Sequence, residues 1–121
     1  MYKDELRQAS GEWQYAVGRR AGCEQVHKAI SAMTSAHPQH VVLKFDCSSA
    51  FNTMPRQLIF DAVCDRAPSL LQVASAWLSR PTVHTVWDEG GVGRSLEATR
   101  GVDQGCPLSP ALFAIGLAPS S

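Results

Sequence analysis

The side chains best suited to chemistry lie in two short segments, one in each half of the chain. In the first, Asp46 directly follows the mostly apolar segment 41–45, where a carboxylate at a strand end can be rigid and open to a cleft. Carboxylate oxygens are the ligands that Mg²⁺ and Mn²⁺ prefer, and such ions activate a hydroxyl and neutralise phosphate charge during phosphoryl transfer. Asp46 is therefore a candidate catalytic residue and metal ligand. The alternative is a helix-capping or solvated aspartate.

An aromatic ring follows this carboxylate by five residues. Phe51 lies where the chain has left the predicted strand, so its ring could lie beside the sugar of a nucleotide whose phosphates are near Asp46. A ring in that position would clash with a ribose 2′-hydroxyl. The alternative is a core phenylalanine that is buried for its area. One ring can do both, because one face can pack in the core while the edge excludes a ribose 2′-hydroxyl.

The second segment carries an amide between two glycines. Gly101 and Gly105 let the backbone bend sharply and approach a ligand closely, and Gln104 offers two donors and an acceptor. A nucleotide sugar or a template backbone could use these groups. The alternative is a strand-to-helix loop with turn glycines and a solvated glutamine.

Apolar residues at helical spacing predict four helices around these segments. The first spans about 22–36 and ends before Pro38, with one buried stripe of Val26, Ala29, Ile30 and Met33.

The second predicted helix is capped by Asn52 or Thr53, accepts Pro55 in its first turn and runs to about Arg66. The other two span about 69–78 and 107–116. The expected inner faces are Leu58, Ile59, Ala62 and Val63; Leu70, Val73, Ala74, Trp77 and Leu78; and Leu108, Ala111, Leu112 and Ile115.

Three strands are predicted between the helices. His40–Asp46 is too evenly apolar for an exposed hairpin and suits a sheet covered on at least one face by helices. Residues 82–87 and 93–99 are β-branched and aromatic, and they flank 88–91, whose two glycines supply the positive φ angles of a hairpin loop. The order of elements predicts a mixed α/β layer structure.

Composition restricts the class of protein. The chain of 121 residues suits a single domain, with 45% apolar and 18% charged residues and neither a membrane span nor a secretory signal. We therefore expect an intracellular protein, in the nucleus or the cytoplasm. Its four scattered cysteines fit reduced thiols better than disulfides or zinc ligands. The formal net charge of zero counts against a complete, self-sufficient nucleic-acid binder.

Both segments resemble motifs of one enzyme family. Residues 45–52 resemble the Asp-x-x-x-Ala-Phe/Tyr-Asn/Asp motif of reverse transcriptases, especially those of non-LTR retrotransposons and group II introns. Residues 101–113 resemble their Gly-x-x-Gln-Gly-x-Pro-Leu-Ser-Pro-x-Leu-Phe motif, and 14–22 is similar to their fingers segment. The resemblance implies that 1–121 is a partial reverse transcriptase domain, with fingers at about 13–39 and a partial palm at 40–121.

The resemblance implies a fold and a reaction. The fold is α/β (α+β), an incomplete fingers-palm portion with helices packed on a small, mostly antiparallel sheet. The reaction is DNA synthesis on an RNA template by two-metal nucleotidyl transfer, with Mg²⁺ or Mn²⁺ bound in the complete domain. The implied partners are an RNA template, a DNA primer, deoxynucleotide triphosphates and the remainder of the polymerase domain, and no membrane.

The resemblance also assigns roles to residues. Asp46 is a catalytic metal ligand, the backbone at Cys47 touches the triphosphate, and Phe51 favours deoxyribonucleotides. Gln104 and Gly105 hold the incoming nucleotide. The remaining candidates, for phosphate or nucleic-acid contacts, are Arg19 and Arg20, for which a plain solvated patch is the alternative.

The chain departs from the family in one respect. Reverse transcriptases follow these motifs with an aromatic-x-Asp-Asp hairpin that completes the metal site, and no Asp-Asp pair occurs here. A lone carboxylate binds Mg²⁺ weakly, so we expect no polymerase activity from this chain alone. The alternatives are a non-catalytic relic of a retroelement and a small α/β nucleic-acid-binding module. Without the hairpin, we expect an unpaired strand edge and exposed apolar faces.

Overall fold

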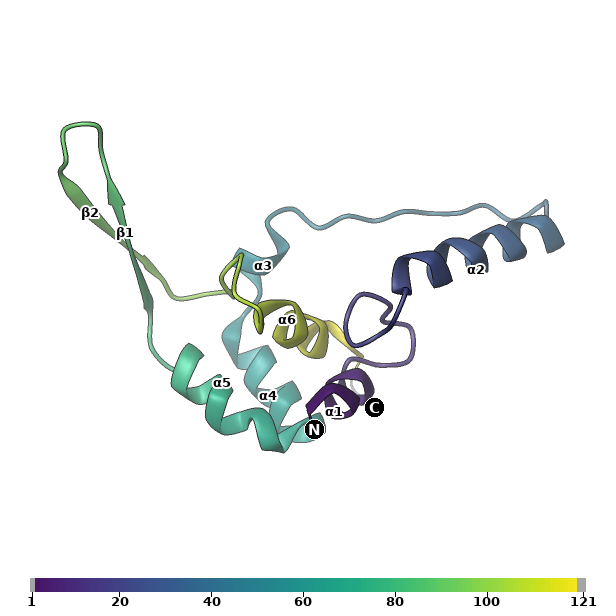
Figure 1. Cartoon of the computed structure of the whole chain (residues 1–121), viewed down its shortest axis with the longest axis horizontal. Helices are drawn as coiled ribbons and strands as arrows, with labels where there is room; N and C mark the ends of the chain where they lie inside the picture. Colours follow the sequence, from purple (N-terminus) through teal and green to yellow (C-terminus); the bar gives the residue numbers. More distant parts are fainter. Residues whose placement is uncertain (1, 120–121) are drawn as a thin grey trace.

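The computed structural model describes residues 2–119 and folds them into helices and one small sheet (Figure 1). In chain order the elements are α1 (Tyr2–Ala9), α2 (Gly22–Ala36), α3 (Ala50–Thr53), α4 (Arg56–Arg66), the 3₁₀ helix η1 (Pro68–Leu70), α5 (Leu71–Leu78), β1 (Thr82–Trp87), β2 (Gly93–Ala98) and α6 (Ser109–Leu117). The sheet consists of β1 and β2 alone, paired antiparallel. The α+β class predicted from the sequence is confirmed.

The core lies among α4, α5 and α6, and α1 packs against α4 and α6. Ile59 and Val63 lie one turn apart on α4 and are fully buried, as is Ile115 of α6. Burial of one such side chain contributes about 1.5–3 kcal/mol. Ala74 and Leu78 of α5 are buried against the same cluster. The 3.6-residue spacing therefore predicted the main core positions correctly.

One arginine joins the ends of two core helices. Arg66, in the last turn of α4, donates from Nη2 to the carbonyl oxygen of Ile115 over 2.7 Å. This carbonyl lies in the last turn of α6, where the helix dipole is negative and unpaired carbonyls favour a cation. The contact links the last turns of these two packed helices.

The predicted helices differ from the structure in their boundaries and faces. The helix expected from Asn52 or Thr53 is divided into α3 and α4, because extended Pro55 occupies the N-cap of α4 and has no N–H to continue α3. The helix expected over 69–78 begins as η1 and continues as α5. Helix α1 was not predicted.

Several expected inner residues are exposed. Leu58, Val73 and Trp77 lie at the margins of the apolar faces of α4 and α5. Each of these helices packs on few neighbours, so only the centre of its apolar face is covered.

The predicted hairpin is confirmed. Strands β1 and β2 pair from Thr82 opposite Ala98 to Trp87 opposite Gly93. The side chain of Asp88 accepts hydrogen bonds from the backbone N–H groups of Gly90 and Val92, which closes the loop. The hairpin stands away from the helices (Figure 1). The helices pack on one another, whereas we expected from the sequence that they would pack on the sheet.

The prediction of a strand at His40–Asp46 is wrong. Within residues 2–119, the only strands are those of the hairpin, and 40–46 is extended chain without ladder hydrogen bonds. A strand needs a neighbour, and none of the described segments pairs with this one. The span of α2 is as predicted, but its stripe is not buried, since Val26, Ile30 and Met33 are exposed.

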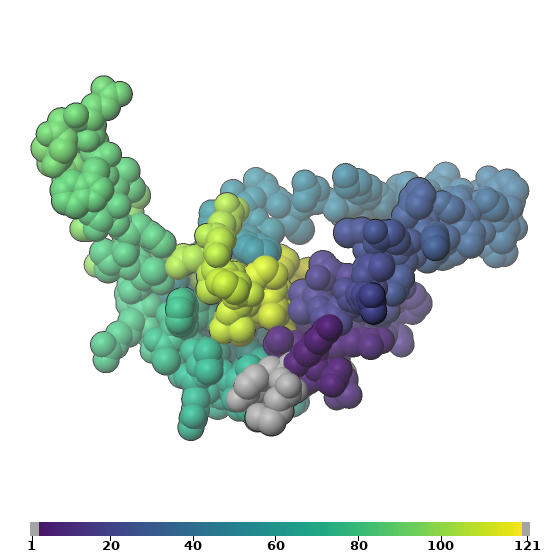
Figure 2. All heavy atoms as spheres, viewed as in Figure 1, coloured from purple at the N-terminus to yellow at the C-terminus, as the bar shows by residue number. Residues whose placement is uncertain are grey.

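Two arms therefore extend from the helical core. The hairpin lies on one side, and α2 with segment 38–48 lies on the other (Figures 1 and 2). None of the helices described within 2–119 is long and apolar enough to cross a membrane. The four cysteines are free thiols, three exposed and Cys106 half-buried.

Candidate functional site

The two chemically interesting segments meet through their backbones. The N–H of Val102 donates to the carbonyl oxygen of Phe51, and the N–H of Gly101 donates to that of Met54, both over 2.8 Å. These bonds hold the loop before α6 against the turn between α3 and α4. Segments from the two halves of the sequence thus form one structural unit.

Glycine is required at the closest point of this contact. Gly101 has a φ of 71°, in the left-handed region. A Cβ atom there would lie 2.2 Å from the carbonyl oxygen of Phe51 and 2.5 Å from the carbonyl carbon of Asn52. Only a residue without a side chain allows this approach.

A buried arginine supports the same loop and was missed by the sequence analysis. Arg56 is 8% exposed and donates from Nε to the carbonyl oxygen of Gly101 over 3.0 Å. Its other nitrogens donate to the carbonyl oxygens of Leu78 and Arg80 and to the hydroxyl of Thr82. A cation in the first turn of a helix is unfavourable next to the positive end of the helix dipole. This unfavourable position was the sequence signal that Arg56 makes stabilising contacts outside its own helix.

A pocket of about 490 Å³ opens beside this contact. It is lined by Asn52, His84, Glu97, Ala98, Thr99, Arg100, Val102, Asp103 and Gln104. Nε2 of His84 lies 3.2 Å from Oδ1 of Asp103, which links the hairpin to the loop before α6. The pocket offers amide, carboxylate, imidazole and guanidinium groups, which can donate and accept hydrogen bonds with a polar ligand. Predicted site residue Gln104 is one of its walls, while Gly105 lies in the same loop with a φ of 90°.

Phe51 is held by packing. Its ring is half-buried and lies against Phe113 of α6, with centroids 4.8 Å apart and planes tilted by 34°. The ring therefore contributes to the core margin. Its backbone carbonyl, bonded to Val102, adjoins the pocket wall. The role of the ring toward a sugar stays a prediction.

Asp46 and Cys47 are not brought to this pocket. Both are exposed in the extended arm before α3, and neither lines the pocket. The expectation that Asp46 projects from a rigid strand end is wrong in this structure, because the strand has no partner. Among residues 2–119, no group of three or more His, Cys, Asp or Glu side chains converges on a point that could hold a metal ion. The donor set therefore does not fit a resident Mg²⁺ or Mn²⁺ site.

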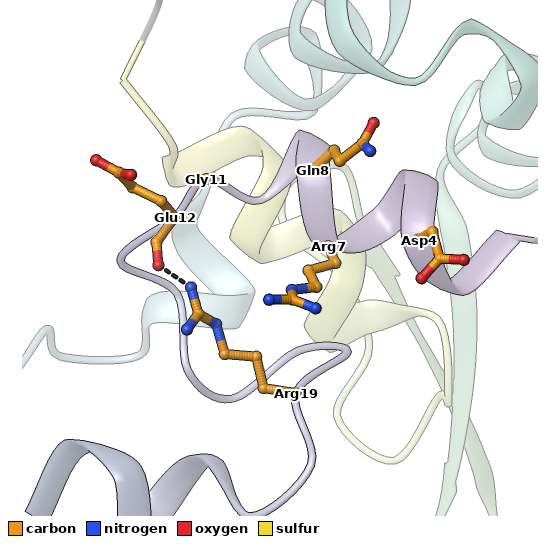
Figure 3. A pocket seen from close by; sticks show the side chains of 6 residues that line it. All are labelled: Asp4, Arg7, Gln8, Gly11, Glu12 and Arg19. Atoms are coloured by element: carbon orange, nitrogen blue, oxygen red, sulfur yellow. Dashed lines mark hydrogen bonds between the residues drawn. The ribbon is translucent and has the colours of Figure 1, made fainter. Parts of the chain in front are cut away.

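The two predicted phosphate-contacting arginines lie elsewhere. Arg19 lines a pocket of about 480 Å³ together with Arg7 of α1, and it donates to the carbonyl oxygen of Glu12 (Figure 3). Its guanidinium carbon also lies 4.5 Å from the centre of the Tyr15 ring, a cation–π contact. Arg20 is exposed. Neither arginine is among the residues that line the Gln104 pocket.

Comparisons with protein-family models, with curated proteins and with solved structures found no match to this chain.

Proposed function

We propose that this chain is part of the fingers and palm of an RNA-directed DNA polymerase of the non-LTR retrotransposon or group II intron type. In this proposal it holds an incoming deoxynucleotide triphosphate near an RNA template and a DNA primer. The observation that carries the proposal is the pair of backbone hydrogen bonds from Gly101 and Val102 to Met54 and Phe51. They join two sequence motifs that resemble those of one active site.

The glycine contact adds support. A chance Gln-Gly sequence needs no particular neighbour, whereas Gly101 lies so close to Phe51 and Asn52 that a Cβ atom cannot be accommodated. Gln104 then lines a polar pocket whose volume of about 490 Å³ suits a small-molecule ligand. Arg56 fixes the loop that carries Gln104 by bonding to Gly101.

The proposal includes no catalysis by this chain alone. Among the described residues, Asp46 belongs to no group of three or more metal-ligating side chains, and magnesium keeps its waters unless several oxygens converge. Nucleotidyl transfer requires further carboxylates, which the remainder of such a polymerase supplies. Primer extension on an RNA template with Mg²⁺ or Mn²⁺ should therefore yield no product from the 121-residue chain.

The decisive experiment measures nucleotide binding. We expect a fluorescent dTTP analogue to bind the chain and the Gln104→Ala variant to bind it about tenfold more weakly, the effect of losing one or two hydrogen bonds. The matched control is Gln57→Ala, an exposed glutamine on α4 outside the pocket, which should leave the affinity unchanged. Equal affinity of all three proteins, or no binding by any of them, contradicts the proposal.

A second candidate is a non-catalytic nucleic-acid-binding relic. The observation that favours it is that Asp46 belongs to no group of three or more metal-ligating side chains in the described chain. It predicts salt-sensitive binding of an RNA/DNA hybrid without any binding of free dTTP. The same titrations therefore separate the two functions.

A further inference from the structure

The extended arm offers an unused strand edge. Within the described residues, no backbone or side-chain hydrogen bond joins 41–47 to another part of the chain. Three alternate side chains point their apolar surface into solvent: Val41 is 82%, Leu43 72% and Phe45 86% exposed. An exposed edge that combines free N–H and C=O groups with apolar side chains is a template for pairing with another strand.

The sequence of this arm is complementary to itself. When two copies run antiparallel about Leu43, that residue faces its own counterpart, Val41 faces Phe45 and Val42 faces Lys44. Successive side chains alternate between faces, so Val41, Leu43 and Phe45 of both copies share one face. Shifting either strand by one residue would place polar side chains among them. One register is thus preferred.

Polar pairs at the ends of the ribbon favour the same register. His40 faces Asp46 of the second copy, and this pair occurs at both ends. Opposite or hydrogen-bonding pairs directly across two strands are favourable. Lys44 lies on the polar face, where its aliphatic stem covers Val42 while the ammonium group reaches water.

A groove beside the arm can receive the partner. It measures about 220 Å³ and lies between α2 and the start of the arm, lined by Ile30, Met33, Thr34, His40, Val41 and Val42. Because Phe45 of the second copy faces Val41, its ring falls at this groove. The contact would also cover more of the α2 stripe, on which Ile30 is 42% and Met33 63% exposed.

We propose that two copies of this chain associate through an antiparallel ribbon formed by residues 40–46 of each, with Phe45 of each copy in the α2 groove of the other. The occupant of the exposed face is a second copy because the arm supplies both the apolar pairs and the complementary His40–Asp46 ends. The proposal does not depend on the proposed nucleotide site. A two-stranded ribbon is marginal alone, so the dimer is weak and concentration-dependent.

The first test measures mass by sedimentation equilibrium from about 1 µM to about 1 mM, the range of weak affinities. We expect a monomer–dimer equilibrium. Leu43→Asp places two carboxylates opposite each other and should raise the dissociation constant at least about tenfold. Leu96→Asp is the matched control, because Leu96 is an exposed leucine on the hairpin, and it should leave the equilibrium unchanged. A monomer at every concentration, or equal effects of both variants, overturns the proposal.

A cysteine test fixes the register without relying on a destabilising change. In a background with Ser at Cys23, Cys47 and Cys64, Leu43→Cys should form an intermolecular disulfide under mild oxidation, since facing Cα atoms lie about 4.5–5.5 Å apart. Val42→Cys should not, because the two copies of residue 42 lie about 8 Å apart, beyond disulfide reach. Equal cross-linking of both variants, or of neither, contradicts the register.

Discussion

The buried guanidinium of Arg56 donates a hydrogen bond of 3.0 Å from Nε to the carbonyl oxygen of Gly101. Its Nη1 donates to the carbonyl oxygen of Arg80 over 2.7 Å, and its Nη2 to the hydroxyl of Thr82 over 3.0 Å. One side chain therefore connects the start of α4, the base of the hairpin and the loop that leads to Gln104. The position of that loop depends on a residue outside both sequence motifs.

Replacing this arginine should destabilise the fold. Arg56→Met keeps much of the packing volume but leaves the carbonyl groups of Gly101 and Arg80 without their donor, and we expect a loss of about 2–4 kcal/mol in the free energy of unfolding. Urea denaturation followed by circular dichroism measures this loss. The neighbouring Gln57→Met, on the exposed side of α4, should change the value by less than about 0.5 kcal/mol. Equal urea midpoints for the two variants would refute the role of Arg56.

The contact at Gly101 can be separated from its backbone conformation. Gly101→Ala suffers both the left-handed φ of 71° and the approach to Phe51, whereas Gly91→Ala suffers a φ of 76° with no atom within 4 Å of the added carbon. We expect a loss of about 1 kcal/mol for Gly91→Ala and at least about 2 kcal/mol more for Gly101→Ala. Thermal and urea denaturation of both variants provide the values. Similar losses would mean that the loop moves freely away from Phe51.

The core prediction uses adjacent residues on α4. Ile59→Ala removes a fully buried side chain and should lower the free energy of unfolding by about 2–5 kcal/mol. Leu58→Ala removes an equally large side chain that is exposed, and it should cost less than about 1 kcal/mol. Comparison of urea midpoints and slopes tests the difference. A larger loss for Leu58→Ala would show that Leu58, and not Ile59, lies on the core-facing side of α4.

Phe51 offers a test of sugar selection. Phe51→Leu retains an apolar contact with Phe113 but removes the ring that the proposed function places beside the sugar. We expect the ratio of dUTP to UTP affinity to fall severalfold, with a stability loss of less than about 1.5 kcal/mol, since these two nucleotides differ only at the 2′ position. Competition binding with the fluorescent dTTP analogue measures the ratio. The core control is Phe113→Leu, which removes the other ring of the pair and should leave the ratio unchanged. A ratio unaffected by Phe51→Leu would assign the ring to packing alone.

The sequence predicted most elements that depend on local signals. The spacing of Ile59 with Val63 and of Leu112 with Ile115 marked the apolar faces that α4 and α6 bury in the core. The hairpin followed from Asp88 and the glycines after it, which form a closed loop by themselves. Such features need no knowledge of the rest of the fold.

Features that depend on distant partners were not predicted in the same way. Segment 40–46 has the composition of a buried strand, but a strand forms only where a neighbour supplies the other half of the hydrogen bonds. The apolar stripe of α2 likewise has the spacing of a buried helix face, but it stays largely exposed because no other element packs extensively against it in the described chain. Arg56 carries no periodic signal, because its partners are backbone carbonyls of Leu78, Arg80 and Gly101. Of the candidate site, the meeting of the Phe51 and Gly101 segments was implied by the motifs, whereas the separation of Asp46 from Gln104 was not.

The bond between Gly101 and Met54 also affects how the chain folds. Between these residues lie α4, η1, α5 and the hairpin, all of which form from contacts between near neighbours on the microsecond scale. Joining the two ends requires closure of the long intervening loop, whose entropy is lost before any contact compensates for it. The pocket beside Gln104 therefore depends on a long-range contact as well as on its local elements. The shared geometry of the two motifs carries a loop-closure entropy cost that none of the intervening helices or the hairpin carries by itself.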